Sequence, residues 1–436
     1  MYKIIKMKKT VLLAAVLQLF MVLGSCSSDS DSTSTPEPPV VVIKAAKVTS
    51  YSKNFGEAGE TITIYGENFS DKISDIKIAF DGISATVVSS TATEIVFKLP
   101  STEKLVPQLS LTIENRTITN EVKNDYKGNI GVLPKSSTTD WFTMDNVLKN
   151  ENKVYSVQVV SDKIMYYSMA DYGASGVYRT IDGGITFVEW GRTGFSGAFS
   201  ATKNDEGWAD TAFGIQKVPV GGSPTMEFIS ATTKGIYYSV YVDDDMKKGT
   251  IITSYGDVYS TADGVEFSQV YDAHFLDKGF DSGSIIKSDE IDNDHIWAIG
   301  MKKVENIYYP FILFKNNETE GWKEHYFASE PNTLAAEVSF ADKANGYFLN
   351  NNSTIYKTTD GGDTWTKIYS GEKFTKLVFK DANTGWAVLE NKIYKTVDGA
   401  KTWTLDYTNT QAIKAIGYKN NIVWAISIDK IIKRYL

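Results

Sequence analysis

The sequence is poor in the residues that usually build reactive or metal-binding sites. It contains one cysteine, three histidines and four arginines among 436 residues. A single thiol, Cys26, can form no internal disulfide, so the folded parts must be held together by packing. The histidines show no ligand spacing such as His-x-x-x-His, and we expect no metal ion at them. No phosphate-binding glycine loop followed by lysine and no nucleophile elbow is present, so the sequence predicts no cofactor.

The sequence also lacks a surplus of positive charge and, after residue 23, any long apolar run. Its formal net charge is −8 and its lysines are scattered, so the surface repels phosphate backbones and we expect no nucleic acid partner. No later stretch is long and apolar enough to predict a membrane-spanning helix. Asp243–Asp245 and Asp289–Asp294 lack the glycine and distal glutamate of a calcium loop. We interpret both as solvated turns, although the sequence leaves calcium binding open.

Residues 1–25 have the pattern of an export signal, which is removed from a mature protein. Four lysines precede an apolar run, Val11–Leu23, that is too short to span a membrane. The run ends in Leu-Gly-Ser-Cys26, which resembles the lipobox of bacterial lipoproteins, and the resemblance implies a lipid anchor on Cys26. The alternative is an ordinary signal followed by an incidental cysteine. Residues 26–42 are rich in Ser, Asp and Pro and predict a disordered tether, so we expect a lipid-anchored protein of the outer membrane or cell surface.

Residues 43–124 alternate apolar and polar positions in short runs, which is typical of a β-sandwich. The runs are broken by Gly66, by Asp81-Gly82 and by Pro100. The segment Gly59–Phe69, with the later runs Ile78–Gly82 and Ile95–Pro100, resembles an IPT/TIG domain, an immunoglobulin-like module. The resemblance implies a spacer or interaction domain and assigns no ligand.

A ten-residue pattern recurs in the rest of the chain. Tyr356–Trp365 and Tyr394–Trp403 share Tyr-Lys-Thr-x-Asp-Gly-x-x-Thr-Trp at a spacing of 38 residues, about the length of a four-stranded propeller blade. Tyr178–Phe187 and Tyr259–Phe267 are further copies. In such a turn the aspartate can accept backbone N–H bonds, the glycine relieves a positive φ and the tryptophan covers the turn. We therefore interpret six residues as structural: Asp182, Asp263, Asp360, Asp398, Trp365 and Trp403.

The pattern resembles the Asp-box, also called the bacterial neuraminidase repeat. Two phrases that precede an Asp-box, Phe340–Tyr347 and Phe379–Trp386, make the chain similar to the photosystem II assembly-factor and sortilin-like group of propellers. The resemblance implies that the Asp-box turns lie on the face opposite the ligand.

A second repeat allows the blades to be counted without the Asp-box. Seven anchors, mostly Trp-Ala, recur at steps of 43, 43, 46, 50, 39 and 38 residues: Met165, Trp208, Ile251, Trp297, Tyr347, Trp386 and Trp424. Residues 132–436 are therefore predicted to form a seven-bladed β-propeller, with six blades as the alternative. Because the chain ends before the last blade has an outer strand, we expect Thr139–Val147 to supply it and close the ring. The predicted fold class is all-β, a sandwich followed by a propeller.

The shortage of arginine bears on the sialidases, the enzymes in which Asp-boxes are best known. Their mechanism needs three arginines that converge on the substrate carboxylate, which lysine does not replace. Arg116 lies in the sandwich and Arg179 leads into an Asp-box, so too few remain. Another glycoside hydrolase would need a close pair of carboxylates, which the sequence cannot place. We predict no catalytic residue.

Aromatic residues outside the repeats are the candidate ligand contacts, since loops that leave the repeat cluster at one mouth of a propeller. They and their neighbours are Trp190, Arg192, Phe195, His274, Phe275, Tyr308 and Tyr309. The alternative is that these side chains only stabilise the loops in which they lie. We predict a non-catalytic protein that binds a glycan or an extracellular protein through the propeller mouth. A docking platform for envelope proteins is the second hypothesis, and a glycoside hydrolase is the third.

Overall fold

A computed structural model describes residues 44–146, 154–171, 174–194, 196–211, 214–222, 227–229, 236–273, 275 and 283–436. These residues form strands and turns, with one short 3-10 helix, η1 (Ile73–Asp75). The all-β class predicted from the sequence is confirmed. No helix in the described ranges is long and apolar enough to cross a membrane.

The N-terminal part is a sandwich of two mainly antiparallel sheets that face each other. One sheet has the order β10-β1-β3-β7-β6 and the other the order β5-β4-β8-β9. The five strands of the first sheet are β1 (Lys47–Tyr51), β3 (Thr61–Glu67), β6 (Thr86–Ser90), β7 (Glu94–Lys98) and β10 (Thr119–Asn120), the last pairing in parallel with β1. The second sheet contains β4 (Ile76–Phe80), β5 (Ile83–Ser84), β8 (Leu109–Ile113) and β9 (Arg116–Thr117).

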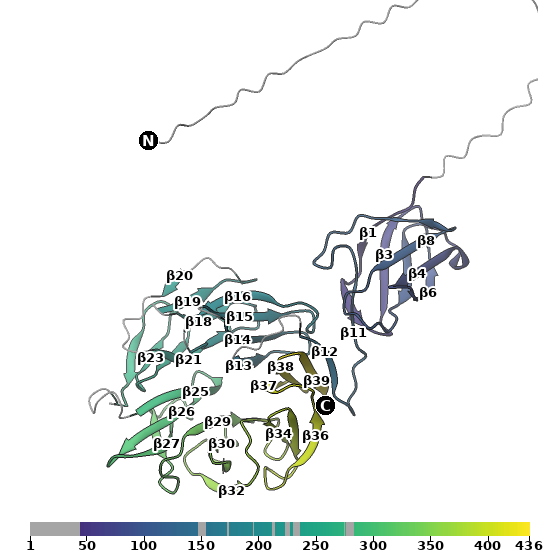
Figure 1. The fold of residues 1–436 in the computed structure, drawn as a ribbon. Helices are drawn as coiled ribbons and strands as arrows, with labels where there is room; N and C mark the ends of the chain where they lie inside the picture. The colour runs from purple at the N-terminus through teal and green to yellow at the C-terminus, as the bar shows by residue number, and fades with distance from the viewer. Residues whose placement is uncertain are drawn as a thin grey trace, which may run out of the picture. The chain divides into compact units, whose positions relative to one another are not determined.

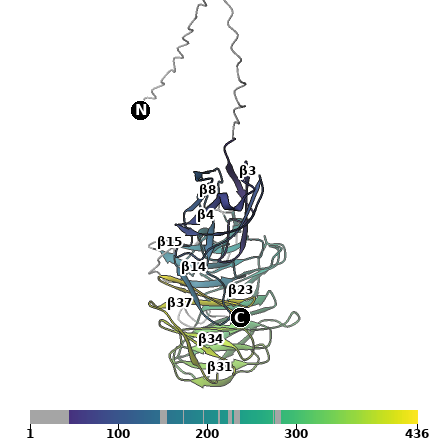
Figure 2. The same ribbon diagram turned by 90° about the vertical axis from the view of Figure 1, so that its right-hand side faces the viewer.

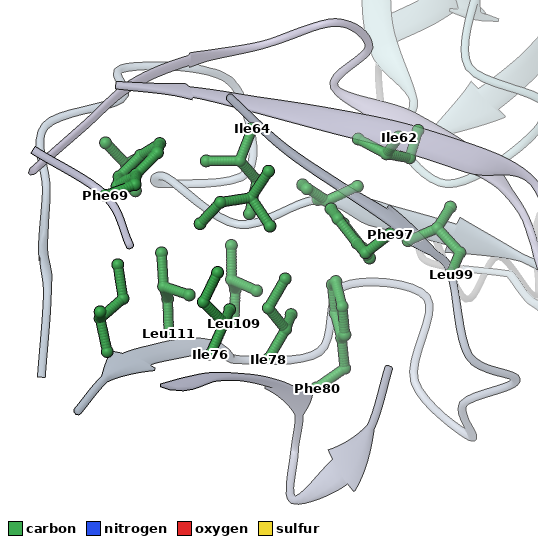
Figure 3. Packing of buried hydrophobic residues seen from close by; sticks show 14 of the residues in the cluster. Ile62, Ile64, Phe69, Ile76, Ile78, Phe80, Phe97, Leu99, Leu109 and Leu111 are labelled. Carbon is green, nitrogen blue, oxygen red and sulfur yellow. The ribbon is translucent and has the colours of Figure 1, made fainter. Parts of the chain in front are cut away.

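The alternation seen in the sequence becomes the core of this sandwich. Every second residue of β4, β7 and β8 is buried, because successive side chains of a strand point to opposite faces. Ile62 and Ile64 of one sheet point toward Ile78, Phe80 and Leu111 of the other, as Figure 3 shows. The sandwich thus buries a continuous aliphatic and aromatic layer without any disulfide.

The sandwich extends further along the chain than the sequence predicts. β11 (Gly131–Leu133) pairs in parallel with β2 (Phe55–Glu57), and Ile130 and Val132 are buried in the sandwich core. The predicted propeller boundary at residue 132 therefore falls inside a strand that belongs with β2. The first strand of the propeller is β12 (Phe142–Asp145).

Seven four-stranded sheets follow one another around a ring in the described part of the chain, and we number them ring sheets 1 to 7 (Figure 1). Figure 2 gives the view turned by 90°, in which β14, β23, β31 and β34 lie in separate sheets. Sheet 1 contains β13 (Val154–Val159), β14 (Met165–Asp171), β15 (Ala174–Thr180) and β16 (Val188–Thr193). Sheet 2 contains β17 (Phe199–Ala201), β18 (Gly207–Thr211), β19 (Gly214–Val218) and β20 (Glu227–Ile229). Sheet 3 contains β21 (Tyr237–Val242), β22 (Gly249–Thr253), β23 (Val258–Thr261) and β24 (Ser268–Tyr271). Sheet 4 contains β25 (Gly283–Asp292), β26 (His295–Val304), β27 (Ile307–Lys315) and β28 (Lys323–Tyr326); sheet 5 contains β29 (Ala335–Phe340), β30 (Gly346–Asn350), β31 (Thr354–Thr358) and β32 (Thr366–Ser370). Sheet 6 contains β33 (Lys376–Phe379), β34 (Gly385–Leu389), β35 (Lys392–Thr396) and β36 (Thr404–Thr408); sheet 7 contains β37 (Ile413–Lys419), β38 (Ile422–Ser427) and β39 (Lys430–Tyr435), with β12 as its outer strand.

The ring closes as the sequence predicts, by pairing its two ends. β12 runs antiparallel to β39, with Met144 opposite Ile431, so the last sheet gains its fourth strand from the start of the propeller. Trp141 stands just before β12, as Trp365 stands before β32, and its Nε1 donates to Asp406 Oδ2 at 2.9 Å. This pairing leaves β39 without an exposed edge.

Lys433 links ring sheets 7 and 1 at the junction where the ring closes, which we call the seam. The side chain is fully buried, and its Nζ donates to the carbonyl oxygens of Asp162 at 2.8 Å and Gly183 at 3.2 Å. It also lies 4.0 Å above the Trp424 ring, a cation–π contact. Burial lowers the pKa of this amine to about 7.

All seven anchors lie on the second strand of their sheets. Five of them face the following sheet, whereas Met165 and Ile251 face the preceding one. Trp208, Trp297, Trp386 and Trp424 are completely buried between neighbouring sheets. Large aromatic side chains fill the wedge between successive sheets and bury much apolar area per residue. Their recurrence is the reason that the ring could be predicted from the sequence.

The sandwich and the ring share one compact unit, residues 45–436. Glu57 of β2 pairs with Lys163 Nζ at 3.2 Å and accepts from the Tyr435 hydroxyl at 3.3 Å. Tyr126 donates its hydroxyl proton to Asp182 Oδ2 at 2.8 Å. The sandwich therefore contacts both sheets that flank the seam.

Candidate functional site

The aspartates of the ten-residue repeat, for which we keep the name Asp-box from the resemblance, are built into turns between the third and fourth strands of their sheets. Asp360 Oδ1 accepts from the Thr364 backbone N–H at 2.9 Å and from the Thr358 hydroxyl at 2.7 Å. Gly361 adopts a φ of +74°, which a side chain would strain. Trp365 closes the turn by donating Nε1 to the Gly362 carbonyl at 2.9 Å.

The turns at Asp182 and Asp398 repeat this geometry, and the turn at Asp263 keeps part of it. Asp182 and Asp398 accept from the hydroxyls of Thr186 and Thr402, each at 2.6 Å. Asp263 accepts from the backbone N–H groups of Val265 and Glu266, both at 2.9 Å. These bonds favour the ionised form, so the pKa of Asp398 is lowered to about 2, chiefly by the Thr402 hydroxyl.

The Asp-box turns share one face of the ring with the turns that join the first and second strands. Gly361 N–H donates to the Ala344 carbonyl, and Gly399 N–H to the Asn383 carbonyl, both at 2.9 Å. We call this side the Asp-box face.

A cavity of about 800 Å³ occupies the centre of the ring. It is lined by the first strand of every ring sheet, β13, β17, β21, β25, β29, β33 and β37, and by turn residues such as Lys203, Asp243 and Asn420. None of the four Asp-box aspartates lines it. Because the lining includes turns of the Asp-box face, the cavity reaches that face, whereas the family resemblance placed a ligand on the opposite one.

Side chains on the first strands bond four pairs of neighbouring sheets together around the cavity. Gln158 accepts from the Ala201 N–H at 2.9 Å and donates to the Ala201 carbonyl at 2.6 Å. Ser200 accepts from the Val242 N–H at 3.2 Å, and Ser339 from the Phe379 N–H at 3.1 Å. Asp289 plays the same part by accepting from the Phe340 N–H at 2.6 Å. The cavity wall is thus hydrogen-bonded from sheet to sheet.

Carboxyl groups outnumber amines in this wall. The lining holds three lysines, Lys203, Lys287 and Lys419, against six acids, namely Asp243, Asp244, Asp245, Asp289, Glu290 and Glu337. Lys203 pairs with Asp244 at 2.8 Å, and Lys287 pairs with Glu337, so both of these amines are already neutralised. The cavity is therefore acidic.

Two neighbouring acids of β25 have shifted pKa values. The pKa of Asp289 is raised to about 7, chiefly by burial and also by the nearby carboxylates of Glu290 and Glu337, while the Phe340 N–H and Lys287 oppose the rise. Burial also raises the pKa of Glu290, although the hydroxyls of Ser288 and Ser239 stabilise its charged form. Both residues are largely buried and line the cavity. A cation entering the cavity would favour their ionised forms.

These acids do not form the convergent pair that a glycoside hydrolase needs. Asp289 and Glu290 are consecutive on one strand, so their side chains point to opposite faces, toward Phe340 and toward Ser239. Glu337 is held by Lys287 and, at 3.5 Å, by Lys376. Each carboxyl group already serves a contact within the wall. In the described ranges, no group of three His, Cys, Asp or Glu could hold a metal ion.

Two of the aromatic residues predicted to contact a ligand are buried, which corrects that prediction. Trp190 lies on β16 rather than in a loop, is 0% exposed and packs edge-on against Tyr166 at 5.2 Å between ring centroids. Phe275 is 2% exposed and packs against Phe311 at 5.5 Å. Neither ring offers a free face to a ligand.

The other predicted contacts are dispersed. Arg192 is exposed and its Nε donates to Glu189 at 3.0 Å. Tyr308 and Tyr309 are partly buried on β27, and the ring centroid of Tyr309 lies 5.6 Å from that of the exposed Tyr326. Phe195 and His274 lie outside the described residues. Tyr308 and Tyr309 are consecutive on one strand, so their side chains point to opposite faces, and neither lines the cavity.

The sequence did carry a signal for the cavity wall. Gln158, Ser200, Asp289 and Ser339 each precede the second-strand residue that they face, Tyr166, Trp208, Trp297 and Tyr347, by eight residues. Polar residues eight positions before an aromatic residue of the next strand would have marked the innermost strands.

Comparison with known proteins agrees with this architecture. Residues 46–128 match the IPT/TIG domain family. No curated protein is significantly similar to the chain in sequence. YCF48 from Cyanidioschyzon merolae is similar in structure, with a TM-score of 0.50 at 14% identity over 68% of this chain and 98% of YCF48. The structure described as YCF48 bound to D1 peptide has a TM-score of 0.49 at 13% identity, over 70% of this chain and 99% of that chain. A protein of unknown function from Bacteroides thetaiotaomicron has a TM-score of 0.39 at 12% identity, over 91% and 98% of the two chains. The chain thus carries an IPT/TIG domain followed by a β-propeller.

Proposed function

We propose that the protein is a non-catalytic binding protein whose propeller holds a basic segment of a partner polypeptide in the central cavity. The observation that carries this proposal is the excess of carboxyl groups in the cavity wall, six against three amines. Lysine or arginine side chains of the partner supply the missing positive charge, which favours association and selects against acidic partners. A cavity of about 800 Å³ accommodates several side chains of such a segment.

The arrangement of the acids supports binding rather than catalysis. Asp289 and Glu290 point away from each other, and Glu337 is neutralised by lysines. General acid and base groups would have to converge on one bond. The carboxyl groups of this wall instead surround a space.

A glycan is the second candidate ligand, because two tyrosine rings lie together on ring sheet 4. Tyr309 and Tyr326 are 5.6 Å apart between ring centroids, and Tyr326 is 42% exposed. Exposed aromatic rings present apolar faces on which a sugar ring can stack. This surface is separate from the cavity lining.

The proposed setting is the cell envelope. The lipobox-like sequence at Cys26 supports a lipid anchor, and residues 26–42 have the composition of a tether. In this arrangement the IPT/TIG domain acts as a spacer, and the propeller docks an extracellular or envelope protein at the outer membrane or cell surface.

A binding titration tests the proposed function. Fluorescent peptides of equal length, one rich in lysine and one rich in glutamate, are titrated with the purified chain at low and high salt. We expect only the basic peptide to bind, and we expect salt to weaken it. The double variant Asp245→Asn, Glu290→Gln should bind roughly tenfold more weakly, since it removes two cavity charges.

The matched control is Glu266→Gln, which removes an exposed charge on the Asp-box face outside the cavity lining. It should leave the affinity unchanged. Equal binding of both peptides, or equal loss in the control and the double variant, would contradict the proposal. Binding of a glycan array that is lost in Tyr309→Ala and Tyr326→Ala would favour the second candidate.

A further inference from the structure

We propose that the interface between ring sheets 1 and 2 holds ordered water in a closed polar chamber. The chamber is formed by Gln216 of sheet 2 with Ser168 and Thr193 of sheet 1, and we call it the Gln216 chamber. Water is the ligand that its chemistry fits, and this inference is independent of the central cavity.

The three side chains are buried and unpaired. Gln216 and Ser168 are 0% exposed, and Thr193 is 9% exposed. The Ser168 and Thr193 hydroxyls and both polar atoms of the Gln216 amide have no protein hydrogen-bond partner within the described ranges. Four such atoms in one interface are unfavourable unless another molecule bonds to them.

The strand geometry brings these side chains to the same interface. Tyr166 and Val177 of sheet 1 pack against Ala209 and Val218 of sheet 2 in one buried cluster. Ser168 follows Tyr166 by two residues and pairs with Val177, so it points toward sheet 2.

Gln216 and Thr193 meet at the same level of this interface. Gln216 pairs with Ala209 and precedes Val218 by two residues, so it points toward sheet 1. A Cβ on Gly191 would lie 3.1 Å from Val218, and Thr193 follows Gly191 by two residues as Gln216 precedes Val218. β16 and β19 run in opposite directions. Two residues forward along β16, from Gly191 to Thr193, and two residues back along β19, from Val218 to Gln216, therefore lead to the same level of the interface.

The repeat shows what normally fills this position. Tyr394 pairs with Ala387, the residue after the anchor Trp386, just as Gln216 pairs with Ala209 after the anchor Trp208. The equivalent residues of Asp-box sheets 1 and 5 are Tyr178 and Tyr356. Sheet 2 lacks an Asp-box, and its glutamine is shorter than tyrosine and ends in a polar amide. Glutamine at this position therefore fills less volume than tyrosine and brings two polar atoms that have no protein partner in the described ranges.

The chemistry of the lining favours water over an ion. Gln216, Ser168 and Thr193 carry no charge, and together they offer both donors and acceptors. Arg179 lies on the same interface, where its terminal nitrogens donate to Asp205 and to the Gly221 carbonyl at 2.9 Å, while its buried Nε has no protein partner in the described ranges. A buried water makes about three hydrogen bonds, which this set of atoms can supply.

A crystal structure of the whole chain at high resolution tests the proposal directly. We expect density for water within about 3.2 Å of Gln216 Nε2 or Oε1 and of the Ser168 hydroxyl. A dry interface, or an interface in which these side chains bond directly to protein atoms, would overturn the inference.

Thermal unfolding gives a second test that does not need crystals. The melting temperatures of Gln216→Leu, Ser168→Ala and the double variant are compared with that of the unmodified chain. If one water bridges the two residues, the shifts are non-additive, because either substitution alone disrupts the same network. Additive shifts would count against a shared water.

Discussion

At the scale of single residues, Trp190 shows how a repeat can mislead. It interrupts the spacing of the tryptophans, which indicated a loop residue free to contact a ligand. In the structure it lies on β16, and its Nε1 donates to the Asp205 carbonyl at 3.2 Å. Sheet 2 has no Asp-box, and Trp190 fills the wedge beside it with Tyr166 and Phe199. The sequence could identify the aromatic residue but not its burial, because burial depends on the neighbouring sheet.

We therefore expect Trp190→Ala to affect stability rather than binding. Removing a fully buried indole leaves a large cavity and should cost about 3–5 kcal/mol of unfolding free energy. Chemical denaturation measures this loss. The exposed neighbour Arg192 is the control, and Arg192→Ala should change the unfolding free energy by less than about 0.5 kcal/mol. A stable Trp190→Ala protein that has lost only its ligand would contradict this interpretation.

Asp210 predicts a dependence of stability on pH. It is 1% exposed on β18, accepts from the Ser196 hydroxyl at 3.0 Å and leaves Oδ1 unpaired. Burial raises its pKa to about 7 from an ordinary value of 3.8. The folded state thus binds the proton more tightly than the unfolded state, so stability falls as pH rises from about 4 to 7.

The variant Asp210→Asn removes this titration. We expect it to be more stable than the unmodified chain at pH 8, by at most roughly 4 kcal/mol, and to keep less than half of that advantage at pH 5. Denaturant titrations at the two pH values measure the difference. An advantage that is the same at both pH values would show that Asp210 does not titrate in this range.

At the scale of elements, the Asp-box turns could be predicted from the sequence because their bonds are local. Each aspartate accepts from groups two to four residues away, so residue spacing alone determines the turn. The sandwich strands could be predicted for the same reason, since alternation is a local pattern. β11 could not, because its pairing with β2 joins segments more than 70 residues apart.

The Asp398 corner allows the structural role to be tested. Asp398→Ala removes bonds from Thr402 and Lys401 and should lower the unfolding free energy by about 1–2 kcal/mol at pH 7. The pKa of Asp398 is lowered to about 2, so its contribution is complete above about pH 4 and is lost as pH falls toward 2. The difference from the unmodified chain should therefore shrink in acid.

Thermal unfolding across this pH range measures the effect, with Asp71→Ala in the sandwich as an exposed control. Peptide binding by Asp398→Ala should be unchanged, because Asp398 does not line the cavity. Loss of binding with normal stability would assign this corner to the site.

At the scale of the whole molecule, ring closure is the contact that the fold depends on. Met144 of β12 is 3% exposed and packs in the core that also holds Trp424 and Ile431. A charge at this position is buried without a partner, so Met144→Asp should cost about 3 kcal/mol or more and open the ring. Thr143→Asp changes the adjacent, exposed residue and should be tolerated.

Proteolysis and size-exclusion chromatography distinguish these two variants. We expect Met144→Asp to be cleaved faster and to aggregate, since β39 then presents an unpaired edge. If both variants behave like the unmodified chain, β12 does not hold the ring closed.

The ring and its closing strand could be predicted from the sequence, but the acidic cavity could not. The anchors and corners repeat at regular intervals, whereas the acids of the cavity come from β25, β29 and the turn after β21. Their common location is a consequence of closing the ring. Asp243–Asp245, interpreted as a solvated turn, lines that cavity.

The most direct test of the central claim is to locate a bound peptide on the molecule. A lysine-rich peptide with a photoreactive group at its centre is cross-linked to the whole chain, and the sites are mapped by mass spectrometry. The account predicts cross-links to the first strands of the ring sheets, especially residues 237–245 and 283–292, and their loss in Asp245→Asn, Glu290→Gln. Cross-links confined to the sandwich or to the outer strands, unchanged in that variant, would contradict it.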